Sequence, residues 1–346
     1  DMVRLWGDFP VITTVAGDIT SENIDEVYPQ YFPEQNTELE AYQQIERDLL
    51  DAVLYAPDNT PGNKTLFTKS VARTLLAKIY AEKPLRDYAK VIHYCDEVKA
   101  DGFDLVEDFN DLFGMNAAGT DAKMRNTKES ILEAQFTSGA GNWCTWMFGR
   151  DLVNWNNNFT WAKWVTPSRD LISAFKQEGD EVRFKESIVY YDCNWSNYYP
   201  SDNYPFMYKC RSANSSIIKF RYADVLLLKA EALIMQDTPD LEGAADIIDK
   251  VRDRAKLGAL PTSVRSNKNV LLNALLKERR LELAFEGQRW FDLVRLDKVE
   301  EVMNAVYAKD SGRKAQIYTF DKNSYRLPIP QSVIDANDKI HQNPGY

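Results

Sequence analysis

Residues 278–296 read ERRLELAFEGQRWFDLVRL, and this stretch decides the fold. Charged residues alternate with large apolar ones around a single glycine, Gly287. One continuous helix would pair successive charges at a spacing of three residues: Glu286 with Arg289, Arg289 with Asp292, and Asp292 with Arg295. Burying a charge without a partner is very costly. We therefore predict an internal structural spine whose charges are paired, rather than a ligand site.

Four other segments extend this pattern. They read VRLWGDFPVIT (3–13), FRYADVLLLKAEAL (220–233), VRDRAKLG (251–258) and RLPIPQSVIDANDKIHQNPGY (326–346). Together with the spine, in this order, they resemble the SusD/RagB family of outer-membrane nutrient-binding lipoproteins of Bacteroidetes. The resemblance covers most of the chain, and the middle is weakly patterned.

The resemblance implies a mostly α fold, in which tetratricopeptide-like helix-turn-helix repeats carry a large loop-rich insertion. It implies a surface-exposed protein of the outer membrane, lipid-anchored in its full-length form, that captures an oligosaccharide without catalysis. The expected partner is a SusC-like TonB-dependent transporter, and no cofactor is expected. In the family, a signal sequence, a lipid-modified Cys and a helical region precede the segment at 3–13. We expect a fragment, a cleaved product or a short family member.

Net charge and hydrophobicity argue against two classes of protein. The chain has 346 residues with a formal net charge of −10, which argues against a nucleic-acid partner because phosphate binding needs a basic surface. It contains no apolar run of about 18 residues, so no transmembrane helix is predicted.

Hydrophobic periodicity predicts paired helices. The predicted helices are 38–54, 68–83 with Thr68 as cap, 88–100, 224–235, 241–255 and one from Asn269. We treat 1–346 as a single domain, with 110–216 as the loop-rich insertion and 217–346 as the C-terminal signature region. Within or beside the insertion we predict strands at 130–136 and 216–220, a capped helix at 166–175, and an Asp180–Arg183 element that, in the family, organises the loops.

The four cysteines are too few for a disulfide scaffold. Cys95 fits a buried position in a helix. Cys193 and Cys210 flank a tyrosine-rich loop, which a disulfide between them would close, and two free thiols are the alternative.

Catalytic signatures are missing from the sequence. With two histidines, no GxSxG, no HExxH and no phosphate-binding glycine loop, the sequence supports no hydrolase triad, zincin site or nucleotide site. A glycosidase stays open, because two ordinary carboxylates suffice for that chemistry. Asp237, Asp240 and Glu242 would suit calcium, but we prefer Asp240 as a helix N-cap.

Aromatic residues mark the candidate ligand surface. Six of the eight tryptophans lie between residues 143 and 195, among many Tyr and Asn residues. Flat rings are platforms for the C–H faces of sugars, while amides satisfy hydroxyl groups. For any one ring, packing in the core is the competing interpretation. The predicted ligand-binding residues are Trp143, Trp146, Trp155, Trp195, Asn197, Tyr198 and Tyr199.

Three other functions remain open. A peptide-capturing RagB-like protein would bind an extended backbone. A glycoside hydrolase would place two carboxylates at the aromatic surface. An intracellular repeat adaptor would bind in the concave face of its helices.

Overall fold

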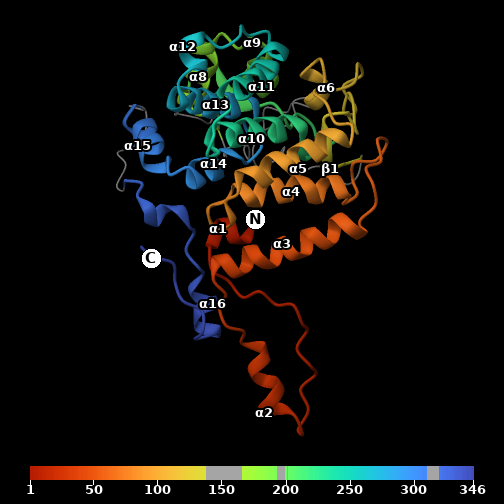
Figure 1. The fold of residues 1–346 in the computed structure, drawn as a ribbon, viewed down its shortest axis with the longest axis vertical. Coiled ribbons are helices and arrows are strands. Elements are labelled where there is room, and N and C mark those ends of the chain that lie inside the picture. Colours follow the sequence, from red (N-terminus) through yellow and green to blue (C-terminus); the bar gives the residue numbers. More distant parts are fainter. Residues whose placement is uncertain (138–165, 193–198, 201, 310–318) are drawn as a thin grey trace.

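The computed structural model describes residues 1–137, 166–192, 199–200, 202–309 and 319–346, and Figure 1 shows their arrangement. No helix in these ranges is both long and apolar enough to cross a membrane. The elements, in chain order, are α1 (Met2–Trp6), α2 (Ile24–Val27), η1 (Tyr28–Tyr31), α3 (Glu38–Tyr55), α4 (Lys69–Ala81), η2 (Lys83–Leu85), α5 (Tyr88–Ala100), α6 (Asn110–Phe113), β1 (Ser130–Ala134), α8 (Arg169–Glu178), α9 (Glu181–Ser187), β2 (Ile188–Tyr191), β3 (Tyr204–Met207), β4 (Ile217–Arg221), α10 (Tyr222–Met235), α11 (Leu241–Arg254), α12 (Thr262–Arg265), α13 (Lys268–Glu282), α14 (Arg289–Arg295), α15 (Val299–Lys309), η3 (Lys322–Tyr325) and α16 (Gln331–Ala336).

Stacked helix pairs form the body of the protein. Helix α3 packs against α4, α4 against α5, α5 against α10, and α10 against α11 and α13. The pairs α4–α5 and α10–α11 are therefore neighbours in space although the insertion separates them in sequence. Ala72 and Ala77 on α4 are fully buried, which lets adjacent helices approach closely. The mostly α, repeat-based fold is the one that the sequence predicts.

Local capping sets most of the predicted helix starts. Thr37 and Glu40 form a reciprocal capping box at the start of α3, and the Asp87 side chain accepts from the backbone N–H of Lys90 at α5. The prediction that Thr68 caps α4 is correct for its position but wrong for the hydrogen bond. Thr68 occupies the N-cap position, but its buried side chain makes no capping hydrogen bond.

Two small antiparallel sheets accompany the helices. Strands β1 and β4 pair with each other, close to the ranges 130–136 and 216–220 that the sequence predicts. Strands β2 and β3 form a second pair, with Ile188 opposite Met207 and Tyr191 opposite Tyr204. Neither β2, β3 nor α9 is predicted by the sequence pattern.

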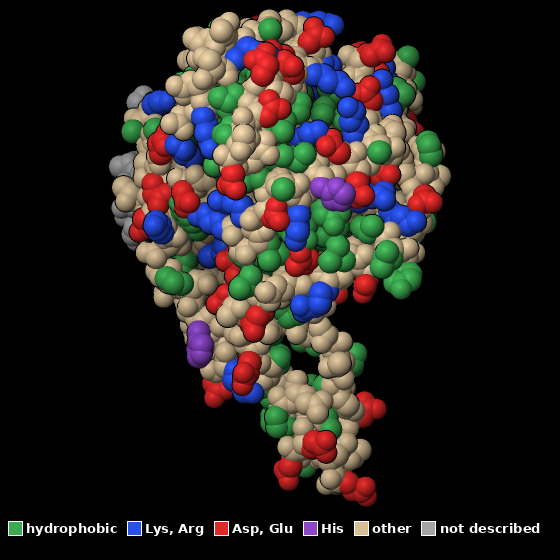
Figure 2. All heavy atoms as spheres, viewed as in Figure 1, with side chains coloured by type: hydrophobic (Ala, Val, Ile, Leu, Met, Phe, Trp, Pro, Cys, Tyr) green, Lys and Arg blue, Asp and Glu red, His purple; other side chains and the backbone are tan. Residues whose placement is uncertain are grey.

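The first and last segments of the chain lie side by side (Figure 1). The backbone N–H of Leu327 donates to the Leu5 carbonyl at 2.7 Å, and the Asn343 amide donates to the Trp6 carbonyl at 2.9 Å. Helix α2 projects away from the body. On the face drawn in Figure 2, cationic and anionic side chains are interspersed over the body.

The predicted continuous helix of the spine is wrong. Helix α13 ends at Glu282, the backbone turns through positive φ at Phe285 (65°) and Gly287 (74°), and α14 starts at Arg289. The break separates Glu286 from Arg289, which donates instead to the Leu276 carbonyl at 3.0 Å. Of the three predicted pairs, only Asp292–Arg295 forms within 4 Å, at 2.8 Å.

Candidate ligand-binding site

An open hollow of about 450 Å³ lies on the insertion side of the molecule, between α8 and the β2–β3 hairpin. One face of α8 forms its floor, and Tyr190 on β2 and the turn before β3 form its walls. The lining residues are Arg169, Ile172, Ser173, Lys176, Gln177, Tyr190, Tyr199, Pro200 and Asn203.

Local caps set both ends of helix α8, and one side of the helix packs into the core. Ser168 caps it, with its hydroxyl accepting from the backbone N–H of Leu171 at 3.1 Å, and Gly179 ends it at a φ of 69°. Thus the predicted capped helix exists but begins three residues later than the range 166–175. Leu171 and Phe175 enter a core cluster with Ile188.

Ion pairs fix both ends of α8 to α13 and its neighbours. Near the N-terminus, the Arg280 guanidinium contacts Asp170 at 2.6 Å. At the C-terminus, Glu178 contacts Arg252 at 2.7 Å and also pairs with Lys277. The helix that forms the floor of the hollow is therefore attached to the repeat body at two points.

Tyr199 is held in a defined orientation at the edge of the hollow. Its hydroxyl donates to the Pro167 carbonyl at 2.8 Å, and its ring meets that of Tyr204 edge-on, with centroids 5.7 Å apart. The Arg169 guanidinium carbon lies 4.8 Å from the centroid of the Tyr199 ring. On the opposite wall, partial burial raises the pKa of the Tyr190 hydroxyl, so it stays a hydrogen-bonding phenol at neutral pH.

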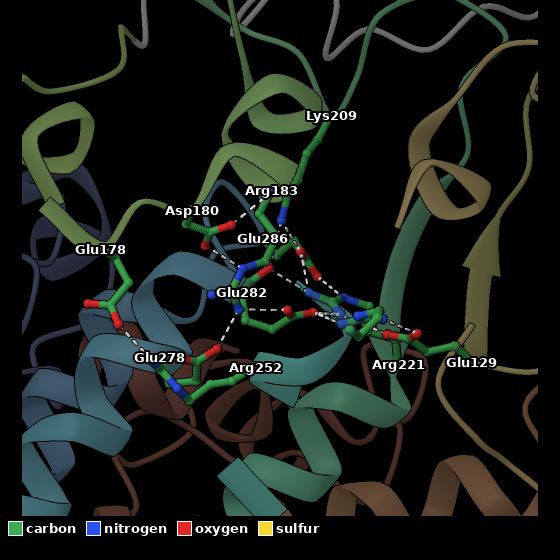
Figure 3. Close-up of polar contacts among 11 residues, drawn as sticks. Glu129, Glu178, Asp180, Arg183, Lys209, Arg221, Arg252, Glu278, Glu282 and Glu286 are labelled. Carbon is green, nitrogen blue, oxygen red and sulfur yellow. Dashed lines mark hydrogen bonds and ion pairs between the residues drawn. The ribbon is translucent and has the colours of Figure 1, made fainter. Parts of the chain in front are cut away.

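A buried ion network joins the insertion to the spine (Figure 3). The fully buried Arg183 contacts Asp180 at 2.6 Å, Glu278 at 2.5 Å and Glu282 at 3.0 Å. The Asp180–Arg183 element thus connects the turn after α8 directly to α13.

A second arginine completes this network from the other side. Arg221 contacts Glu129 at 2.8 Å, Glu282 at 2.5 Å and Glu286 at 2.7 Å. Although burial alone would raise it, the surrounding guanidinium groups hold the pKa of Glu282 well below its usual range. Glu286 also accepts from the Lys209 ammonium at 2.6 Å, and burial lowers the pKa of that lysine to about 8. The network is structural, as the sequence predicts for the spine, but its partners come from distant segments.

The lining of the hollow suits a polar ligand that contains flat rings. Two tyrosine rings offer stacking surfaces, and Ser173, Gln177 and Asn203 offer hydrogen-bonding groups. None of the lining residues that the structure describes is a carboxylate, and glycoside hydrolysis by the usual route needs two.

Of the predicted ligand-binding residues, the structure describes one, Tyr199, and places it in this hollow. The other six lie outside the described residues: Trp143, Trp146, Trp155, Trp195, Asn197 and Tyr198. The sequence analysis did not single out Arg169 or Lys176, and it counted Tyr190 among the surrounding tyrosines without selecting it as a candidate. The spacing of Arg169, Ser173 and Lys176 on a single helical face is the signal by which the floor of the hollow could have been found.

Other sequence predictions have mixed outcomes. Cys95 is buried, as predicted, with its sulfur 3.5 Å from the Val225 carbonyl oxygen. Cys210 is buried too, whereas Cys193 lies outside the described residues, so the disulfide and its alternative, two free thiols, are both untested. Asp240 caps α11 by accepting from the backbone N–H of Gly243 at 2.9 Å, which is the alternative that we preferred to calcium binding.

The fold and the hollow define an α-helical repeat protein with a ligand-sized hollow beside its insertion. A model described as the SusD family matches residues 202–346. The SusD-like protein P2 of Formosa agariphila is 28% identical over all of this chain and 71% of its own length. Residues 202–346 therefore match the SusD/RagB family, and the chain as a whole is similar to a SusD-like protein.

Solved structures share the fold. A SusD-like protein from Bacteroides fragilis matches all of this chain and 76% of its own, with a TM-score of 0.75 and 22% identity. A laminarin-binding SusD-like protein matches 99% of this chain and 75% of its own, with a TM-score of 0.71 and 23% identity.

Proposed function

We propose that this protein captures an oligosaccharide at the hollow beside α8 and delivers it, chemically unchanged, to a SusC-like TonB-dependent transporter. The observation that carries the proposal is the hollow itself, where Tyr190 and Tyr199 stand beside amide and hydroxyl groups. Such a lining matches the alternating C–H faces and hydroxyl edges of sugar rings. In an open site, stacking and hydrogen bonding give weak affinity, roughly micromolar to millimolar.

Three further observations support parts of this proposal. The similarity to the SusD/RagB family supports a surface location at the outer membrane, with a lipid anchor in the full-length protein, and supports the transporter as partner. The laminarin-binding protein with the same fold supports a glycan as ligand. The lining residues that the structure describes include no carboxylate, which supports a non-catalytic role at this site.

The insertion, residues 110–216, belongs to the proposed site. Tyr199 has a described place in the hollow, and the six other predicted residues lie in the same part of the sequence. We extend the proposed ligand surface to them, with Trp155 and Trp195 as the next stacking platforms.

Glycan binding is tested by affinity electrophoresis and calorimetry with a panel of oligosaccharides, beginning with laminarin fragments. Tyr199→Ala should weaken binding by about 1 kcal/mol, roughly fivefold in Kd, because a stacking face is lost. Tyr199→Phe keeps the ring and should bind almost normally. Tyr55→Ala is the matched control, since Tyr55 lies at the end of α3 and is 83% exposed.

The alternatives make different predictions in the same assays. Binding to a peptide library but to none of the sugars would replace the proposed ligand with an extended peptide. Release of reducing sugar by the purified chain would replace binding with hydrolysis. Failure to co-purify with a transporter encoded beside it would remove the delivery step while leaving capture intact.

A further inference from the structure

Among the residues that the structure describes, the charged groups that line the hollow are both positive. They are Arg169 and Lys176, and no described carboxylate lines it. This is unusual for a chain with a formal net charge of −10. A local positive site in an acidic protein attracts anions that the rest of the surface repels.

Ion pairing removes the acids of α8 from the hollow. The helix carries Asp170 and Glu178 as well as its cations. Asp170 pairs with Arg280 at 2.6 Å, and Glu178 pairs with Arg252 at 2.7 Å, so both carboxylates face α13 and its neighbours. The acids that build the scaffold are thereby separated from the cations that line the hollow. The exposed Asp192 and Asp202 lie near the hairpin in sequence but do not line the hollow.

The two cations differ in how they present their charge. Lys176 is exposed and forms no ion pair with any residue that the structure describes. Arg169 lies over the Tyr199 ring, and this stacking orients a planar group that suits bidentate contact with carboxylate or sulfate. They are seven positions apart on α8, about 10 Å along the axis, which exceeds one pyranose ring. They would therefore contact anionic groups on different units of one oligosaccharide.

We infer that the hollow selects acidic oligosaccharides, an inference that rests on the proposed function. Arg169 and Lys176 hold the uronate or sulfate groups of the ligand, and its sugar rings stack on Tyr190 and Tyr199. Both anionic groups offer these cations charged oxygen atoms that accept hydrogen bonds.

The experiment measures Kd by calorimetry for three probes of similar length: neutral laminarihexaose, a hexauronate from alginate, and a sulfated oligosaccharide from carrageenan. At least one acidic probe should bind about tenfold more tightly than the neutral one, since hydrogen bonds between charged groups are the stronger kind. That advantage should shrink with added salt. Which acidic probe binds distinguishes uronate from sulfate as the recognised group.

Paired variants locate the effect. Lys176→Gln and Arg169→Gln should each lower the ratio of acidic to neutral affinity, whereas Lys176→Arg should keep it; the affinity of each variant for the neutral probe is measured as the reference for that ratio. Lys185→Gln is the matched control, because Lys185 is an exposed lysine on the next helix that does not line the hollow.

The possible results distinguish failure of the charge selection from failure of the proposed function. Equal binding of neutral and acidic probes, unaffected by Lys176→Gln, overturns the charge selection and leaves glycan capture standing. Equal weakening by Lys185→Gln and Lys176→Gln shows unspecific attraction and also overturns it. Binding of none of the probes by the unsubstituted chain overturns the proposed function, and the selection with it.

Discussion

Replacing Arg221 with Met should destabilise the protein far more than replacing an arginine at the surface. The Arg221 side chain is 1% exposed and contacts three carboxylates, on Glu129, Glu282 and Glu286, at 2.5–2.8 Å. Removing one partner from a buried ion pair costs about 3–5 kcal/mol, because the remaining charge stays desolvated. Methionine keeps much of the apolar volume of the arginine stem, so the charge is the main loss.

The structure places the expected cost near the lower end of this range. Arg254 also contacts Glu129, at 2.6 Å, and pairs with Glu282. Glu286 keeps the Lys209 ammonium at 2.6 Å. Because every one of these carboxylates retains at least one cation, we expect a loss of about 3 kcal/mol in the free energy of unfolding.

Urea unfolding, followed by circular dichroism, measures this loss. The control is Arg265→Met, because Arg265 pairs with Glu242 and Asp246, whose side chains are 73% and 68% exposed, and with only one partly buried carboxylate, that of Asp249. Exposed ion pairs contribute about 0–1 kcal/mol. If Arg221→Met lowers the free energy of unfolding by no more than Arg265→Met does, the network does not hold the insertion on the spine in the way proposed.

Two further predictions concern pH and the backbone. Burial lowers the pKa of Lys209 to about 8, below its usual 10.5, so the unfolded chain binds more protons between these values and stability should rise with pH across this window. The gain in the free energy of unfolding across this window approaches about 3 kcal/mol and should vanish in Lys209→Met. Urea unfolding from pH 7 to 10 measures it: if the free energy of unfolding rises equally with pH in both proteins, Lys209 is not the group responsible. Gly287→Ala should lower the free energy of unfolding by about 1–2 kcal/mol because Gly287 has a φ of 74°, a backbone conformation unfavourable for alanine. Gly258→Ala, where an added methyl meets nothing within 4 Å and φ is not positive, is the control, and similar losses for both would show that the backbone turn is not under this constraint.

The paired helices could be predicted because their signals are local. Periodicity of apolar residues over one or two turns marks α5 at its observed bounds, Tyr88–Ala100, and a capping box three residues long starts α3. The strands β1 and β4 follow from short apolar runs, whereas β2 and β3 lie in a tyrosine-rich segment without clear alternation. The sequence could single out Tyr199 as a candidate because aromatic rings among polar residues are visible in it. The nearness of Tyr190 and Lys176 to Tyr199 could not be predicted, because it arises only from folding.

The amino-acid sequence alone determined the helical repeat class, the family resemblance and the need for paired charges in the spine. Tertiary structure decided which charges pair: Glu282 meets Arg221, 61 positions away, and Glu286 meets Arg221 rather than its neighbour Arg289. It also decided that the helix breaks between Glu282 and Arg289, and that α8 turns its acids toward α13 and its cations toward the hollow. The physical reason is range. Backbone hydrogen bonds and capping act within a few residues, but a buried charge is stabilised by whichever partner the packed chain brings to it.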